Sequence, residues 1–196
     1  MRRLRIISFS ILLFVLLTAC GGKPFNVKPK PDLPARELGA EAVAGNLTLQ
    51  AEAVTDEDFL YETFDANLIL AGVLPVRVTV SSREQEPVDL RKAKFEVKTS
   101  GGRTYKTISA NSAFKRAISY YGISTYSKEG YKESQSDFAS HAIDLREPLA
   151  AGASRHGMIF FQVPDDVART AGLTLVSRNL NRKLPKSESQ IEIKLN

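Results

Sequence analysis

The residues best suited to metal chemistry in this sequence are a histidine and a methionine two positions apart. His156 and Met158 offer an imidazole and a thioether, a ligand pair that suits Cu(I). His141 could supply a second imidazole, but Met158 is the only methionine besides Met1, so a second thioether is lacking. It also alternates with Phe160 along an apolar run, which favours a place in the core. We therefore expect no metal site.

The second histidine has neighbours that could serve nucleophilic catalysis. His141 follows Ser140 and lies three residues before Asp144. A serine nucleophile needs a base and a turn that exposes it, and no Gly-x-Ser-x-Gly elbow precedes this group. These residues are therefore expected to be solvated, and we expect neither an enzyme nor a cofactor.

Four tyrosines are the side chains best suited to contact a partner. They lie in or near one region that is rich in lysine and arginine, and aromatic residues with arginine are enriched in interface hot spots. The alternative is that these rings cover an open end of the domain as ordinary packing. The candidate partner-binding residues are Tyr120, Tyr121, Tyr126 and Tyr131.

The single cysteine, Cys20, ends a segment that is typical of exported proteins. Residues 1–5 carry three arginines, and residues 6–17 form an almost unbroken apolar run. This run is shorter than the roughly 20 residues that span a bilayer. Residues 1–19 are therefore expected to be a signal peptide. The sequence Leu-Thr-Ala-Cys at residues 17–20 resembles the bacterial lipobox, whose cysteine is lipidated and becomes the first residue after cleavage.

The lipobox resemblance implies a membrane anchor at Cys20. A diacylglycerol on the thiol and an acyl chain such as palmitate on the new amino terminus would anchor the protein stably. The rest of the chain would lie outside the cytoplasm, and Gly21 favours the outer membrane, on its periplasmic face, if the host has one. The alternative is an ordinary signal peptide with an incidental cysteine.

The composition after the leader is that of one globular domain. Of the 196 residues, 177 follow position 19, which suits one domain with a sizeable core. Loss of the three leader arginines lowers the formal net charge from +5 to +2. No long basic block suggests nucleic acid, and export makes that partner improbable.

Residues 20–44 are predicted to be a tether and residues 45–196 a β-rich domain. Prolines and lysines in the first segment favour an extended, solvated spacer. In the second, period-two alternation predicts a series of short strands. Thr-Asp-Glu-Asp at residues 55–58 lacks the spacing of a calcium loop and predicts a helix start. The predicted strands or extended segments are residues 46–54, 73–82, 88–90, 95–99, 103–105, 142–145, 157–163, 173–177 and 191–195.

Residues 107–141 interrupt this series and are predicted to be an insertion. Phe114, Ala117, Ile118 and Tyr121 have helical spacing, and Gly122 is a natural helix end. The remainder contains Tyr126 and Tyr131 and is rich in Ser, Lys and Gly, and its pattern predicts no particular element. The fold class is therefore mainly β, an antiparallel sandwich with a short helical insertion.

Three stretches of the domain share a strand–turn–strand pattern. They are residues 72–80 with 86–90, residues 95–97 with 101–105, and residues 149–152 with 160–164. In this order they resemble the immunoglobulin-like domains of unknown function in bacterial lipoproteins, which share their fold with secreted mycobacterial immunoprotective antigens. The resemblance implies an immunoglobulin-like sandwich and no catalytic residue.

These observations predict a lipid-anchored, extracytoplasmic binding or structural module of the cell envelope. We expect it to recognise another envelope protein, through the tyrosine-rich insertion or through a sheet edge. The alternative is an accessory protein that binds a small ligand or a metal ion.

Overall fold

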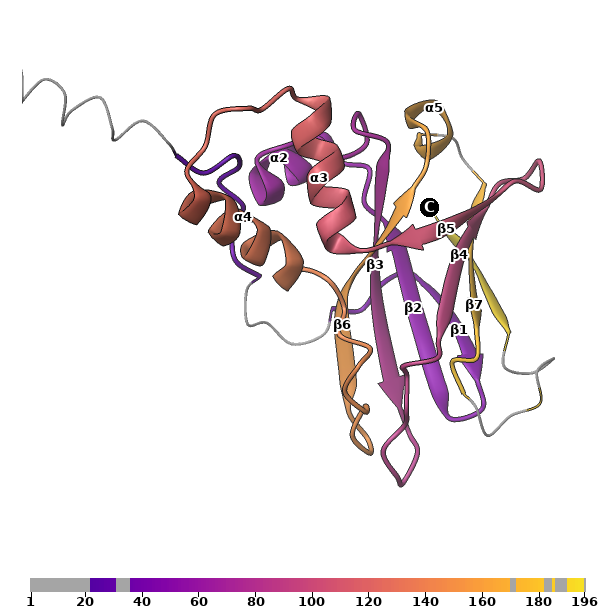
Figure 1. Ribbon diagram of the computed structural model, residues 1–196. Coiled ribbons are helices and arrows are strands. Elements are labelled where there is room, and N and C mark those ends of the chain that lie inside the picture. Colours follow the sequence, from indigo (N-terminus) through magenta and orange to yellow (C-terminus); the bar gives the residue numbers. More distant parts are fainter. Residues whose placement is uncertain (1–21, 31–35, 170–171, 182–184, 186–189, 196) are drawn as a thin grey trace, which may run out of the picture.

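The computed structural model describes residues 22–30, 36–169, 172–181, 185 and 190–195. Within them, eight strands form the body of the molecule and helices gather at one of its ends (Figure 1). The mainly β class predicted from the sequence is confirmed. The strands are β1 (Ala40–Ala44), β2 (Leu47–Ala53), β3 (Val73–Ser82), β4 (Lys94–Lys98), β5 (Thr104–Ile108), β6 (Ser154–Gln162), β7 (Leu173–Arg178) and β8 (Ile191–Leu195).

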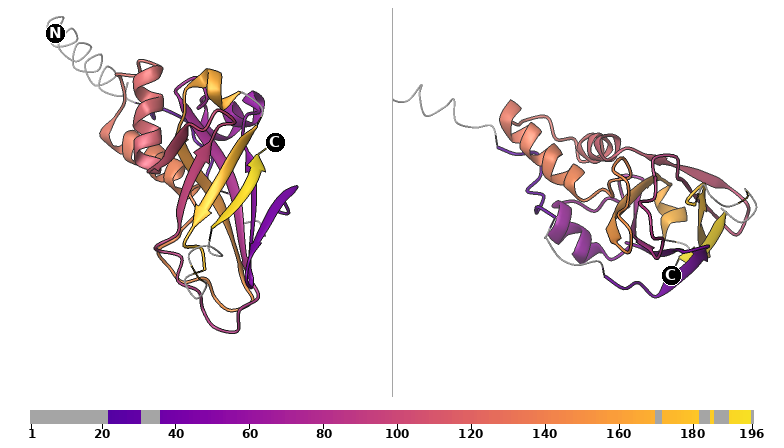
Figure 2. Two further views of the ribbon diagram at one scale, coloured as in Figure 1. Left: turned by 90° about the vertical axis from the view of Figure 1, so that its right-hand side faces the viewer. Right: turned by 90° about the horizontal axis from the view of Figure 1, so that it is seen from below.

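The strands pair in the order β1-β2-β3-β6-β5-β4-β7-β8, and all neighbours are antiparallel. The pairing between β5 and β6 is short, because only Thr107 and Ile108 of β5 take part in it. The sheet folds over at this point, so that β8 also contacts β1 and β2. The result is a two-layered β-sandwich, which Figure 2 shows from two further directions.

Strand β3 lies at the centre of the first layer, where all of its residues are buried or half-buried. It pairs with β2 through Val76–Ser82 and with β6 along most of its length. Val76, Val78 and Val80 are completely buried. Branched side chains pack well on a pleated surface, and their burial supplies the main stabilising term of the core.

Four helices accompany the strands in the described part of the chain. Helix α2 begins where the acidic run predicts, because the Asp56 carboxylate accepts a hydrogen bond of 2.7 Å from the backbone N–H of Phe59. Helix α3 matches the predicted helical spacing and ends before Gly122, which has a positive φ of 63°. The bounds are α2 (Glu57–Phe64), α3 (Ala110–Tyr120), α4 (Lys128–Ser140) and α5 (Asp165–Ala168).

Helix α4, in the second half of the insertion, was not predicted from the sequence. The Ser127 side chain caps it by accepting a hydrogen bond from the backbone N–H of Gly130 at 2.9 Å. Its buried residues are Gly130, Ser134 and Phe138, of which only one is a large apolar residue. The helix therefore lacks the apolar periodicity by which amphipathic helices are recognised.

The predicted tether over residues 20–44 is also corrected where the structure describes it. Residues 22–30, which we call the strap, lie along α4 and α2, and Phe25 and Val27 are buried in the core. Residues 40–44 form strand β1 rather than spacer. Alternation of apolar and polar residues in the strap turns Phe25 and Val27 inward, and proline is compatible with this extended backbone.

Candidate functional site

The structure divides the four candidate tyrosines into two exposed rings and two packed ones. Tyr120 is 54% exposed and Tyr126 is 37% exposed. Tyr121 lies between Tyr120 and Phe25, with ring centroids 5.1 and 6.0 Å away. Tyr131 supports Tyr126 at 5.2 Å. The structure therefore gives two packed rings and two exposed ones.

Tyr121 is held by hydrogen bonds as well as by its ring contacts. Its hydroxyl accepts a hydrogen bond of 2.9 Å from the backbone N–H of Asn67 and donates one of 3.2 Å to the Asn67 carbonyl. Burial, followed by a hydrogen bond with Tyr61, raises the pKa of Tyr121 to about 12. Tyr61, in α2, is itself 47% exposed and extends the aromatic surface. Sequence reasoning missed it because it is distant from the insertion.

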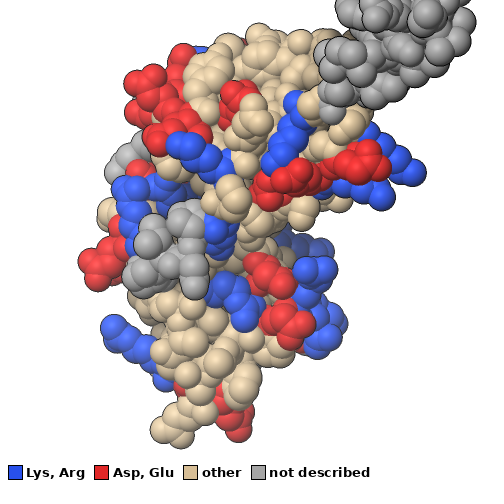
Figure 3. Space-filling view, turned by 90° about the vertical axis from the view of Figure 1, so that its left-hand side faces the viewer, with Lys and Arg blue, Asp and Glu red and all other residues tan. Residues whose placement is uncertain are grey.

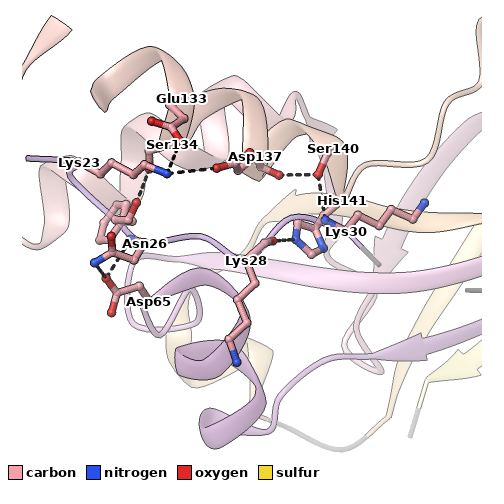
Figure 4. A network of polar contacts seen from close by, with 11 residues as sticks. Lys23, Asn26, Lys28, Lys30, Asp65, Glu133, Ser134, Asp137, Ser140 and His141 are labelled. Atoms are coloured by element: carbon pink, nitrogen blue, oxygen red, sulfur yellow. Dashed lines mark hydrogen bonds and ion pairs between the residues drawn. The ribbon is translucent and has the colours of Figure 1, made fainter. Parts of the chain in front are cut away.

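The strap joins this aromatic surface to the amino-terminal end of the described chain. The backbone N–H of Ser127 donates a hydrogen bond of 3.1 Å to the Gly22 carbonyl. The Lys23 ammonium lies 2.6 Å from the Glu133 carboxylate. The Ser134 hydroxyl, buried in α4, donates a hydrogen bond of 2.7 Å to the carbonyl oxygen of Phe25 (Figure 4).

The second half of the strap is tied to α2 and to the end of α4. The backbone N–H of Lys28 donates a hydrogen bond of 2.9 Å to the Thr63 carbonyl. The Nε2 atom of His141 lies 2.7 Å from the carbonyl oxygen of Lys28, where it donates in the tautomer that carries this proton. His141 is buried, which corrects the expectation that it is solvated, because the strap and α2 cover it. This loss of water lowers its pKa below the usual 6.5.

A cavity of about 450 Å³ opens beside this part of the strap. Its volume is in the range of small-molecule sites, and its walls combine apolar and basic side chains. Both histidines line it, together with Met158, so the structure brings together the three residues that suggested copper chemistry. The lining residues are Lys28, Pro29, Lys30, Arg36, Phe59, Glu62, Thr63, Arg77, His141, His156, Gly157 and Met158.

The cavity has more cations than carboxylates. Lys28 pairs with Glu62 at 2.8 Å, and Arg77 lies 3.0 Å from Glu52, which also faces Arg36. Lys30 differs, because within the described residues its ammonium has no carboxylate partner and donates to the His156 carbonyl at 2.7 Å. Burial lowers the pKa of Lys30. The arrangement suits an organic anion better than a cation.

The geometry does not favour a metal. Among the described residues, no three side chains of His, Cys, Asp or Glu are grouped as they would be around a metal ion. Met158 is buried in β6, as its alternation with Phe160 predicts. His141 directs Nε2 to a backbone carbonyl, and Lys30 lies close enough to lower its pKa further.

The basic side chains of the cavity were not predicted as a site. Lys28 and Lys30 lie in the segment interpreted as a solvated tether, while Arg77 comes from β3. A signal was nevertheless present, because Arg77 is the one charged residue in a strand whose other residues are apolar or small and uncharged. In the structure its guanidinium lies 4.8 Å from the centroid of the Phe59 ring.

The predicted lipidation site, Cys20, lies outside the described residues. The helices in the described part of the chain are all too short or too polar to span a bilayer.

Comparisons with known proteins return fold neighbours and no family. No protein-family model matches the chain, and no curated protein matches it. One similar solved structure is the yjhA protein of Bacillus subtilis, with 13% identity and a TM-score of 0.43, covering 83% of this chain and 100% of that one. Another is an uncharacterised β-sandwich protein of Clostridium difficile 630, with 10% identity and a TM-score of 0.37, covering 76% and 92%.

Proposed function

We propose that this protein is a lipid-anchored, extracytoplasmic binding module of the bacterial cell envelope. The basic and apolar leader followed by the sole cysteine supports the anchor at Cys20. The strand–turn–strand motifs support placing the domain among the immunoglobulin-like domains of bacterial lipoproteins. In a host with two membranes, the periplasmic face of the outer membrane is the proposed location.

The module is proposed to recognise another envelope protein, and the observation that carries this is the pair of exposed rings on the insertion. Tyr120 and Tyr126 stand on rigid supports, because Tyr121 and Tyr131 pack beneath them. A tyrosine held in one orientation loses little entropy on binding and offers both apolar area and a hydroxyl. Such rings are typical anchors of protein interfaces.

Crosslinking in intact cells tests this proposal. The tagged protein and a variant with Tyr120→Ala and Tyr126→Ala are crosslinked, captured from the envelope and analysed by mass spectrometry. We expect one dominant partner with the unchanged protein and its loss with the variant. Equal capture by both forms would show that these rings are not the recognition surface.

The anchor is tested separately with Cys20→Ser. We expect this variant to appear in the soluble extracytoplasmic fraction with an unchanged melting temperature, while the parent protein needs detergent. A Cys20→Ser variant that still needs detergent would contradict the lipoprotein assignment.

A second candidate function is the binding of a small organic anion with an apolar body. It is favoured by the cavity, where Lys30 lacks a carboxylate partner among the described residues and Phe59 and Met158 supply apolar wall. Calorimetric titration of the Cys20→Ser protein with octanoate, and with octanol as the uncharged control, tests it. We expect octanoate to bind and Lys30→Gln to abolish that binding, whereas Lys98→Gln on β4 should not. Equal binding of octanol, or none of octanoate, would exclude this candidate.

A further inference from the structure

We propose that the end of the domain formed by the strap, α3 and α4 rests on the membrane surface, with Tyr126 and Tyr120 at the level of the lipid headgroups. This orientation rests on the proposed lipid anchor at Cys20. It also specifies the proposed partner, since a protein that contacts these two rings would have to be embedded in the same membrane.

The first step of the argument is the short distance between the anchor and the domain. Gly22 is only two residues after Cys20, and two residues of extended chain reach at most about 7 Å. The Gly22 carbonyl is bound by the N–H of Ser127, the residue that caps α4. The lipid would therefore be attached close to the first turn of this helix, without a spacer to lift the domain from the bilayer.

The second step is that the strap is part of the folded core. Phe25 and Val27 are each only 3% exposed, and the burial of such apolar side chains stabilises the folded state. The fit against α4 is close at Gly130, where a Cβ atom would lie 2.6 Å from the Gly22 carbonyl oxygen. Release of the strap would expose these side chains and break its hydrogen bonds, so the chain that leads to the anchor leaves the domain at this end.

The third step is the position and chemistry of the exposed rings. Tyr126 directly precedes Ser127 and therefore lies beside the Gly22 contact. Tyr120 reaches the strap through Tyr121, whose ring packs against Phe25. Tyrosine is enriched at membrane–water interfaces because its ring prefers an apolar environment and its hydroxyl prefers water. The two rings are thus suited to the membrane–water interface, next to which the lipid anchor would place them.

The charges near this end indicate that the anchor supplies the binding energy and the rings supply the orientation. Helix α4 carries Lys128 and Lys132 together with Glu129 and Glu133. Basic and acidic side chains are mixed over the face shown in Figure 3. A polybasic patch would bind anionic lipids without an anchor. Here we expect the Cys20→Ser protein to remain free of vesicles.

Fluorescence quenching in vesicles tests the orientation, because the chain has no tryptophan. The lipidated protein carrying Tyr126→Trp is reconstituted into phosphatidylcholine–phosphatidylethanolamine vesicles, with or without acyl chains brominated near the headgroups. The matched control is Val43→Trp, which is 59% exposed near the β1–β2 turn, at the opposite end of the sandwich from α3 and α4 (Figure 1). We expect brominated lipid to quench the Tyr126→Trp reporter and to leave the Val43→Trp reporter unchanged.

A spacer variant tests the role of the strap without altering the fold. Insertion of 20 Gly/Ser residues between Gly21 and Gly22 would let the domain move by roughly 25 Å from its lipid. We expect this insertion to abolish the quenching of the Tyr126→Trp reporter while the protein stays on the vesicles. Quenching that persists with the spacer would show that the rings bind the membrane by themselves, and it would contradict orientation by the strap.

Failure of the proposed orientation and failure of the proposed anchor give different results. If mass spectrometry finds the lipid on Cys20 and the Tyr126→Trp reporter is unquenched, the orientation is wrong and the anchor stands. If Cys20 carries no lipid, both the anchor and the orientation are overturned.

Discussion

The backbone N–H of Ser127 and the carbonyl oxygen of Gly22 are joined by a hydrogen bond of 3.1 Å. This contact ties the first described residue to the capping residue of α4. It makes the segment after the proposed lipid site part of the domain, although its composition is that of a spacer. The contribution of this contact and of the surrounding packing to the free energy of unfolding can be measured with variants of the Cys20→Ser protein.

The strap should contribute to global stability. Phe25→Ala removes a ring that is 3% exposed and packs against Phe114 and Tyr121, so we expect a loss of about 3–5 kcal/mol in the free energy of unfolding. Urea unfolding followed by circular dichroism measures this loss. The control is Lys28→Ala, which removes an exposed ion pair with Glu62 and should cost less than about 1 kcal/mol. An equally small loss for both variants would restore the tether interpretation.

Gly157 in β6 should not tolerate a side chain. A Cβ atom there would lie 2.5 Å from the backbone nitrogen of Ile143 and 2.6 Å from its Cα atom. The chain leaving α4 crosses β6 at this point, where the N–H of Met158 donates a hydrogen bond of 2.7 Å to the His141 carbonyl. Because backbone atoms cannot yield as a flexible side chain does, we expect Gly157→Ala to cost about 3 kcal/mol or more.

The control for this substitution is Gly101→Ala in the β4–β5 hairpin. Its nearest neighbour to an added Cβ is the Thr99 hydroxyl at 3.8 Å. We expect a change within about 0.5 kcal/mol in thermal or urea unfolding. Similar losses for Gly157→Ala and Gly101→Ala would contradict the close crossing at β6.

His141 should make the domain less stable in mild acid. Burial lowers its pKa in the folded protein, so on acidification the unfolded chain, with a pKa near 6.5, takes up the proton first. The stability contribution is complete above pH 6.5 and is lost as the pH falls toward the lowered pKa of the folded state. We expect the stability difference between the parent and His141→Gln to shrink from pH 7.5 to pH 5.

Urea unfolding at several pH values measures this difference. The neighbouring Ser140→Ala variant carries no titrating change and should keep the pH dependence of the parent protein. An identical pH dependence in His141→Gln would show that this histidine does not contribute it.

The tyrosines should separate into two classes by their effect on stability. Tyr121→Phe removes the hydroxyl bound to both backbone groups of Asn67, so we expect it to cost about 1 kcal/mol. Tyr120→Phe and Tyr126→Phe alter exposed rings and should change the free energy of unfolding by less than about 0.5 kcal/mol. Differential scanning calorimetry separates the classes. Equal losses in all three variants would mean that the hydroxyls of Tyr120 and Tyr126 contribute to the fold as much as that of Tyr121.

Local patterns in the sequence identify most of the strands and two of the helices. Val76, Val78 and Val80 alternate with more polar residues, and this pattern depends on the pleat of a strand rather than on its neighbours. Asp56 predicts the start of α2 and Gly122 the end of α3, because capping involves residues close in sequence. The basic and apolar leader with Cys20 is likewise a local signal, which supports the proposed anchor.

Tertiary structure alone decided the features that join distant parts of the chain. Helix α4 buries Gly130, which lets the strap approach closely, and Ser134, which donates a hydrogen bond to the strap. Because neither residue is a large apolar one, the sequence of α4 shows no apolar periodicity that would predict the helix. In the sequence, Lys28 and Lys30 look like residues of a spacer. Only the fold shows that they form hydrogen bonds with Thr63, His141 and His156. Whether a tyrosine is exposed or packed depends on which rings lie beneath it. These contacts link positions far apart in sequence, and local pattern carries no information about them.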